Sequence, residues 1–128
     1  MKVPTALIAL SYFAHLGLCV PGTATTYNKQ PFPNKCYGYN TAEIPLNGLY
    51  GAVGLRFWDG NAACGRKYQI TCIGPPPGGK GRCTDKSVVI KVVEGRLGSK
   101  APDVSLGPAA AALLYTGGGL FGVQIHEV

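Results

Sequence analysis

The chain has 128 residues, which is the size of one domain. Hydrophobic residues make up 46% of it and charged residues 14%, while Gly contributes 19 residues and Pro 10. This composition excludes a disordered chain and a collagen repeat, and it favours short strands and turns over a helix bundle. The formal net charge is +6, but the basic residues are scattered along the chain, which argues against a nucleic-acid-binding element. Two interpretations of the charge remain: a soluble basic surface, or a weak preference for acidic polymers such as pectin or an anionic membrane.

The N-terminal segment resembles a secretory signal peptide. Lys2 precedes a mostly apolar run, Val3–Val20, and small residues follow it. Cleavage after Cys19 or after Gly22 fits, and we favour Gly22, so residues 1–22 are the predicted signal and 23–128 the mature domain. A lipid-anchored form is disfavoured because the bulky Leu18 precedes Cys19. The run contains polar residues and is short for a bilayer span, and no second such run occurs.

Four cysteines remain after this cleavage: Cys36, Cys64, Cys72 and Cys83. An even number in a small exported chain predicts two disulfides. A zinc site is disfavoured because it needs cysteine pairs two to four residues apart, and no two of these lie so close. We therefore expect no metal.

Four segments have strand-like sequences before the one candidate helix. They are rich in β-branched and aromatic residues: 23–27, 49–53, 67–72 and 87–93. The near-continuous Val and Ile of the segment 87–93 indicate burial on both faces, as in a barrel or a sandwich. A turn at 59–61 and a Pro-Gly loop at 74–81 separate the strands.

The helix is predicted over 105–116. Ser105 can act as its N-cap and Pro108 fits its first turn, while the alanine run that follows favours helix and Gly117 ends it. A last strand is predicted over 120–125, and it would place the apolar residues Phe121, Val123 and Ile125 on one face. The order of elements predicts a mainly β domain, a small barrel with one helix inserted.

Several motifs, taken in order, resemble one known family. They are Cys36-Tyr37-Gly38-Tyr39, the block from Trp58 to Cys72 with its Cys-Gly-x-x-Tyr-x-x-x-Cys pattern, Ser87–Val93 and Asp103-Val104-Ser105. Together they resemble the expansin-like double-psi β-barrel domain, and most of all the plant natriuretic peptide and barwin-like group of single secreted domains. The resemblance implies a six-stranded double-psi barrel over 23–128. It also implies the disulfides Cys36–Cys64 and Cys72–Cys83.

The sequence departs from the family pattern at three places. Two further cysteines usual after the strongest strand are missing from the segment 94–100. Leu55 stands where an Asp usually precedes the Trp by three residues, and Glu94 stands where an Asp ends the strong strand. The Asp of the Asp-Leu-Ser motif is retained as Asp103.

Two carboxylates are candidate groove residues. In related endoglucanases and expansins the residue matching Asp103 acts as a general acid or lines the groove, and Glu94 is the second candidate. The alternatives are that Asp103 interacts with the dipole of a nearby helix start and that Glu94 is solvated in a turn. Thr25 and Tyr27 match groove positions of the family's first strand, or are merely β-prone residues. Trp58 could stack on a sugar, or fill the barrel core.

The resemblance does not extend to hydrolysis. Glycoside hydrolysis needs a proton donor and a base or nucleophile at a defined separation. The extra base of the endoglucanases has no counterpart, because the predicted first strand contains no acid. His126 has no Cys or Ser partner pattern, and the triple glycine at 117–119 lacks the Lys of a phosphate-binding loop. We therefore expect no enzyme, no catalytic residue and no cofactor.

The sequence thus predicts a secreted, monomeric protein of the apoplast or cell wall. It would bind wall polysaccharide, or act through a cell-surface receptor on water and ion homeostasis, and no nucleic acid is expected as a partner. The alternatives are a wall-loosening or weakly glucan-cleaving protein and an elicitor similar to the fungal cerato-platanins.

Overall fold

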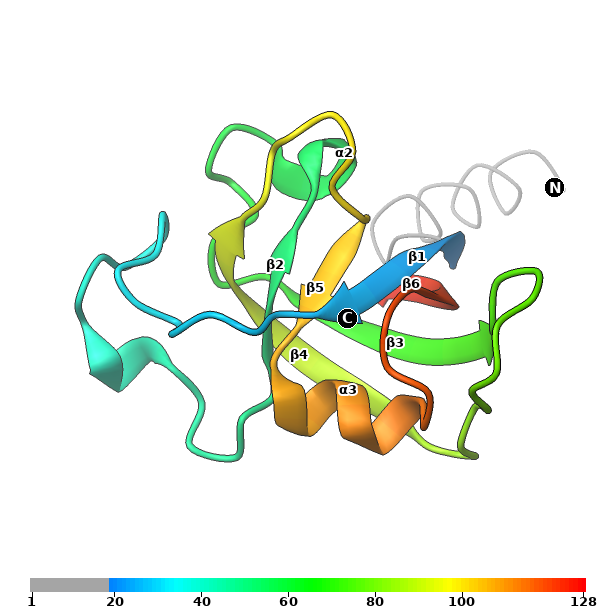
Figure 1. The fold of residues 1–128 in the computed structure, drawn as a ribbon. Helices are drawn as coiled ribbons and strands as arrows, with labels where there is room; N and C mark the ends of the chain where they lie inside the picture. The colour runs from blue at the N-terminus through cyan, green and yellow to red at the C-terminus, as the bar shows by residue number, and fades with distance from the viewer. Residues whose placement is uncertain (1–18) are drawn as a thin grey trace, which may run out of the picture.

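The computed structural model describes residues 19–128 and shows a closed six-stranded barrel in the order β1-β5-β2-β4-β3-β6 (Figure 1). The predicted signal peptide falls almost entirely on residues 1–18, outside the described residues. The elements in chain order are β1 (Val20–Thr26), η1 (Thr41–Glu43), β2 (Tyr50–Val53), α2 (Leu55–Trp58), β3 (Lys67–Gly74), β4 (Ser87–Gly95), β5 (Val104–Leu106), α3 (Pro108–Leu114) and β6 (Phe121–Glu127). The mainly β barrel expected from the sequence is confirmed.

The barrel is assembled from strands that are distant in the sequence. β1 runs parallel to β5 and β2 runs parallel to β4, whereas the other four pairings are antiparallel. A barrel closed in this way has no free sheet edge, so every strand has hydrogen-bonding partners on both sides.

The core fills the inside of the barrel with alternate residues of each strand. In β6, Phe121, Val123 and Ile125 are at most 1% exposed, as the sequence predicted. In β3, Tyr68 and Ile70 point inward with the same two-residue alternation. α3 covers one end of the barrel, and Tyr115, just after the helix, stacks on Phe121 with ring centroids 4.6 Å apart.

Three boundaries differ from the prediction. β1 begins at Val20 rather than Thr23, because residues 20–24 pair with β6. The short strand β5 was missed, and Ser105 lies in it instead of capping a helix. The N-cap of α3 is Gly107, whose carbonyl accepts the amide of Ala111 at 3.0 Å. Ser105 was misassigned because pairing with β1 and β2 on both sides fixes it as strand, which local sequence does not reveal.

Both disulfides implied by the resemblance are present. Cys36–Cys64 joins the segment 28–49 to the loop that follows α2, and Cys72–Cys83 closes the Pro-Gly loop between β3 and β4. We call residues 28–49 the arm. It lies beside the barrel at the left of Figure 1.

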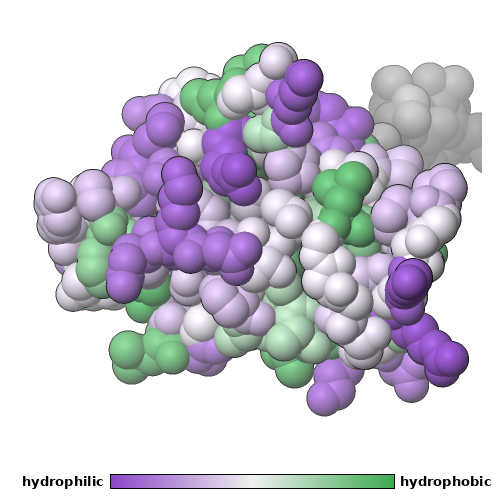
Figure 2. Space-filling model, in the orientation of Figure 1, coloured by the Kyte–Doolittle hydropathy of each residue, from purple (hydrophilic) through white to green (hydrophobic). Residues whose placement is uncertain are grey.

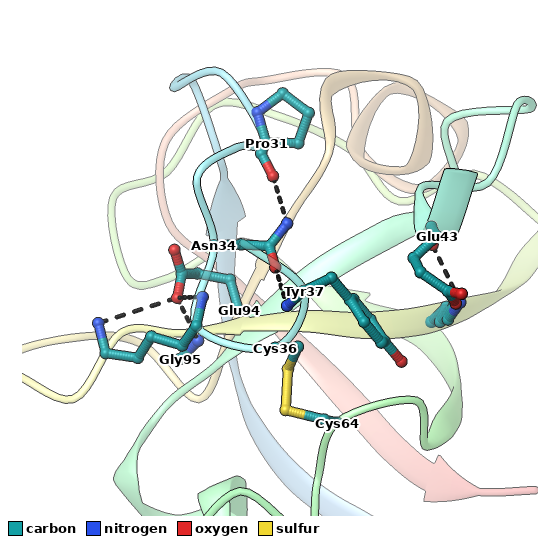
Figure 3. The surroundings of a disulfide bond; sticks show 10 residues. Pro31, Asn34, Cys36, Tyr37, Glu43, Cys64, Glu94 and Gly95 are labelled. Atoms are coloured by element: carbon teal, nitrogen blue, oxygen red, sulfur yellow. Dashed lines mark hydrogen bonds and ion pairs between the residues drawn. A yellow bond between two sulfur atoms is a disulfide. The ribbon is translucent and has the colours of Figure 1, made fainter. Parts of the chain in front are cut away.

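The arm covers a second apolar cluster, outside the barrel. Tyr27, Tyr50, Ala52 and Val93 are buried there, with Tyr37 and Ile44 of the arm packed against them. Asn34 shapes the turn of the arm, since its side chain donates to the carbonyl of Pro31 at 2.6 Å and accepts the amide of Tyr37 at 2.6 Å (Figure 3). Among residues 19–128, no helix is long and apolar enough to cross a membrane.

Candidate functional site

Four neighbouring strands present a row of side chains on the outside of the barrel. The register places Thr25 opposite Ser105, Ser105 opposite Ala52, and Ala52 opposite Glu94. The residues one step away on β1, β5 and β2 are Ala24, Val104 and Val53, all 0% exposed in the core. Because successive side chains of a strand point to opposite faces, the side chains of Thr25, Ser105, Ala52 and Glu94 face outward. We call Thr25, Ser105, Ala52 and Glu94 the outer row.

Glu94 anchors the arm to the end of β4. Its Oε1 accepts the backbone amides of Lys35 at 2.9 Å and Gly95 at 3.0 Å, and the ammonium group of Lys35 lies 3.8 Å away (Figure 3). The Glu94 side chain is only 12% exposed. The alternative of a solvated turn residue is therefore wrong. Glu94 is a largely buried strand residue, and its Oε1 takes part in all three of these contacts.

Tyr27 follows β1 and extends its pairing, since its amide donates to the carbonyl of Leu106 at 2.6 Å. Its ring is buried in the cluster under the arm. Burial raises the pKa of the Tyr27 hydroxyl above its ordinary value, and the negative charge of Glu94 raises it further, against the opposing charge of Arg96. The phenol therefore stays neutral at physiological pH and offers a polar group next to Glu94.

Asp103 lies at the start of β5 and clamps it to β1. Its Oδ2 accepts the amide of Thr23 at 3.0 Å, and its own amide donates to the Thr23 hydroxyl at 3.3 Å. The Nε of Arg56 lies 3.5 Å from Oδ1. Gly22 leaves the room for this carboxylate, since a Cβ there would lie 2.6 Å from Oδ2. The helix-dipole alternative is wrong, because β5 separates Asp103 from α3.

The structure places three of the five candidate residues outside the barrel. Thr25 and Glu94 belong to the outer row, and Tyr27 directly follows β1. Asp103 directly precedes β5, and its Oδ2 lies on the side of Gly22 that faces Ile125 of the core. Tyr27 and Glu94 line a common pocket, whereas Asp103 lies towards the other end of β1, beside Thr23.

Trp58 is not on this face. It is 7% exposed and belongs to the core cluster. Its ring packs so closely on Gly95 that a Cβ there would lie 2.7 Å from the ring. A buried ring packed in this way fills the core and does not offer a flat face to a sugar from solvent.

Sequence reasoning missed Arg96 and Ser105. The Nη1 of Arg96 donates to the Ser105 hydroxyl at 3.1 Å, and the Arg96 amide donates to the carbonyl of Val53 at 2.9 Å. Arg96 is exposed, so its guanidinium adds a cation to the outer row. Arg96 follows the last residue of β4, so the alternation of the strand gave no signal for it.

A pocket of about 910 Å³ adjoins the outer row, between the arm and the segment 94–102. This volume is within the range of small-molecule sites, roughly 300–1,000 Å³. Figure 2, in the orientation of Figure 1, shows hydrophilic residues gathered left of centre, over the region between the arm and the segment that follows β4. Among residues 19–128, no group of three or more His, Cys, Asp and Glu side chains could hold a metal ion.

The closed six-stranded barrel with its two disulfides agrees with the expansin-like double-psi fold that the sequence resemblance implied. No family model matches the chain. It is 27% identical over 92 residues to "EG45-like domain containing protein 2" of Arabidopsis thaliana, a match covering 72% of this chain and 67% of that protein. It is 29% identical over 90 residues to "Putative EG45-like domain containing protein 1" of the same plant, covering 70% and 65%.

Solved structures confirm the fold. The expansin of Clavibacter michiganensis matches with a TM-score of 0.62 at 22% identity, over 87% of this chain and 50% of the expansin. A mutant of that expansin in complex with cellohexaose matches with a TM-score of 0.63 at 22% identity, over the same shares. The chain thus spans about half the length of the expansins it matches. The resemblance found in the sequence is confirmed: the relatives are EG45-like, plant natriuretic peptide-like domain proteins, and the structural neighbours are expansins.

Proposed function

We propose that this chain is a secreted cell-wall protein that binds glucan along the outer row without cleaving it. The observation that carries the proposal is the alignment of Thr25, Ser105 and Glu94 across paired strands, with Arg96 beside them, on a fold whose expansin neighbour was solved with cellohexaose. Sugar hydroxyls both donate and accept hydrogen bonds. Ser105 and Ala52 are only 1% exposed, so the groups that the row and its neighbour offer to a sugar are the half-buried Thr25 hydroxyl and the exposed Arg96 guanidinium.

The absence of hydrolysis is part of the proposal, and the contacts of the two carboxylates support it. Asp103 accepts the Thr23 amide with one oxygen and pairs with Arg56 through the other. Glu94 holds the backbone of Lys35 and Gly95. Both carboxylates therefore already fix the positions of strands or of the arm. β1, with the sequence VPGTATT, provides no third acid to act as the missing base.

The experiment is calorimetric titration of the purified domain with cellohexaose, together with an assay for released reducing ends. Arg96→Ala should weaken binding about tenfold, because a hydrogen bond to a charged group contributes roughly 1.5–3 kcal/mol. Lys80→Ala, in the Pro-Gly loop, is the matched control and should leave the affinity unchanged. No binding by the wild type would overturn the proposal, and release of reducing ends that Asp103→Asn abolishes would make the protein a hydrolase.

Secretion and action in the apoplast or cell wall rest on the N-terminal segment and on the likeness to EG45-like domain proteins. The alternative partner is a cell-surface receptor acting on water and ion balance, suggested by the same likeness. Expression of the full chain in plant cells, followed by recovery from the medium and N-terminal sequencing, tests secretion. Size-exclusion chromatography tests the expected monomer.

A further inference from the structure

The pocket beside the outer row is strongly basic. Of the residues that line it, four are cations and one is an acid: Lys29, Lys35, Arg96, Lys100 and Glu94. Lys29 and Lys35 come from the arm, whereas Arg96 and Lys100 come from the segment between β4 and β5. Two chain segments far apart in sequence therefore place positive charge around one cavity, and Lys29 and Arg96 also line a common smaller pocket.

These charges are largely unneutralised. Glu94, the acidic residue of the lining, is paired with Lys35 at 3.8 Å. Within residues 19–128, none of Lys29, Arg96 and Lys100 forms an ion pair with a carboxylate. Elsewhere in the described chain, Arg56, Arg66 and Lys91 each have an acidic partner, whereas Lys67, Lys80, Arg82 and Lys86 have none. The pocket differs in that three unpaired cations line one cavity. Because like charges in one cavity repel, such an arrangement favours an anionic ligand.

The pocket is continuous with the outer row. Glu94 ends the row and lines the pocket, and Arg96 reaches from the pocket lining to Ser105 in the row. A polysaccharide chain bound along the row would therefore extend into this basic pocket. A single small anion would use only part of a cavity of about 910 Å³, whereas a polymer with a carboxylate on successive sugars would meet several cations in turn.

We propose that the pocket recognises uronate carboxylates, so that the preferred ligand of the site is an acidic polysaccharide rather than a neutral glucan. This inference rests on the proposed function, since it names the substrate class of the same site. The lysines act here as point charges for carboxylates, and Arg96 adds the planar donor fork that matches a carboxylate in a bidentate manner.

The experiment compares hexagalacturonate with cellohexaose by calorimetry and takes the ratio of the two affinities, which a general loss of folding does not change. The wild type should favour hexagalacturonate by about tenfold, the combined effect of a few exposed ion pairs. Lys29→Gln with Lys100→Gln should lower this ratio about fivefold or more. The matched control is Lys80→Gln with Lys86→Gln, which removes the same charge from the part of the chain preceding β4, and it should leave the ratio within about twofold.

The outcomes separate the two proposals. Binding of cellohexaose with no preference for hexagalacturonate overturns the uronate inference and leaves the proposed function standing. Failure to bind either sugar overturns both. If the affinity ratio fell equally in the control variant, the preference for hexagalacturonate would come from the net charge of the protein, and the assignment of uronate binding to the pocket would be wrong. Binding to phosphatidylglycerol vesicles that the Lys29 and Lys100 variant abolishes, without hexagalacturonate binding, would assign the pocket to a membrane surface instead.

Discussion

The two faces of the same four strands have opposite characters. Val104 and Ser105 are neighbours in β5, yet Val104 is buried with Ala24 and Val53 inside the barrel, whereas Ser105 faces outward. There Ser105 is also 1% exposed, and its hydroxyl accepts a hydrogen bond from Arg96. Val92 and Val93 show the same contrast within β4, since Val92 lies in the barrel core and Val93 in the cluster under the arm. The comparison teaches that stability and recognition are divided between alternate residues of one strand, so substitutions one position apart should have separable effects.

The largest effect is expected inside the barrel. Ile90→Ala should lower the free energy of unfolding by about 2–5 kcal/mol, because Ile90 is 0% exposed and its truncation leaves a cavity. Thr25→Ala on the outer face should change it by no more than about 0.5 kcal/mol. Urea unfolding followed by fluorescence measures both. Equal losses in the two variants would show that the outer row is part of the stabilising core.

Removal of each disulfide should likewise have a different effect on ligand binding, although both removals lower stability. Replacing Cys36 and Cys64 with Ser should cost about 3–4 kcal/mol and replacing Cys72 and Cys83 about 3 kcal/mol, since the loops span 28 and 11 residues. The first disulfide holds the arm, which supplies one wall of the pocket, so its loss should also weaken ligand binding. The second should leave binding intact below its unfolding temperature. Thermal unfolding and calorimetry on both variants decide this, and a loss of binding only in the second would contradict it.

The start of β1 gives a smaller effect. A chain starting at Val20 should be more stable than one starting at Thr23 by about 2 kcal/mol, because Val20, Pro21 and Gly22 pair with β6 and each backbone hydrogen bond contributes about 1 kcal/mol. Differential scanning calorimetry of the two purified forms measures the difference. Equal melting temperatures would show that the pairing of residues 20–22 with β6 does not stabilise the barrel.

The smallest effect concerns the clamp between β1 and β5. Asp103→Ala should cost about 1 kcal/mol, because the Thr23 amide loses its acceptor and Arg56 its partner. Asp103→Asn keeps an acceptor oxygen for the amide and should recover most of that loss. Chemical denaturation of the pair of variants measures this. If both variants weaken ligand binding without altering stability, Asp103 contacts the ligand directly.

Much of the fold could be predicted from local sequence. β3, β4 and β6 have long alternating or continuous apolar patterns, and their predicted positions hold to within a few residues. β5 could not be found in this way. It has only three residues, and they become strand because β1 and β2 lie on either side. For the same reason Ser105 looked like a helix cap, since Pro108 and an alanine run follow it closely.

The site was predicted in part. The resemblance pointed to Asp103, Glu94, Thr25 and Tyr27. The register places Thr25 and Glu94 in the outer row, and Tyr27 and Glu94 line one pocket, whereas Asp103 lies near the other end of β1. The basic pocket could not be predicted, because Lys29 and Lys35 meet Arg96 and Lys100 only when the arm folds against the end of β4. That meeting depends on the contact of Lys35 with Glu94 and on the Cys36–Cys64 disulfide, which are tertiary features.

The position of β6 has a consequence for when this protein can fold. β6 is the last strand along the chain, and it closes the barrel by inserting between β1, the first strand described, and β3. Until residues 121–127 have left the ribosome, β1 and β3 each have a bare edge, and the non-local pairings that close the barrel are slow to form. The barrel therefore closes only after β6 has been made, and until then the edges of β1 and β3 are open to pairing with other strands.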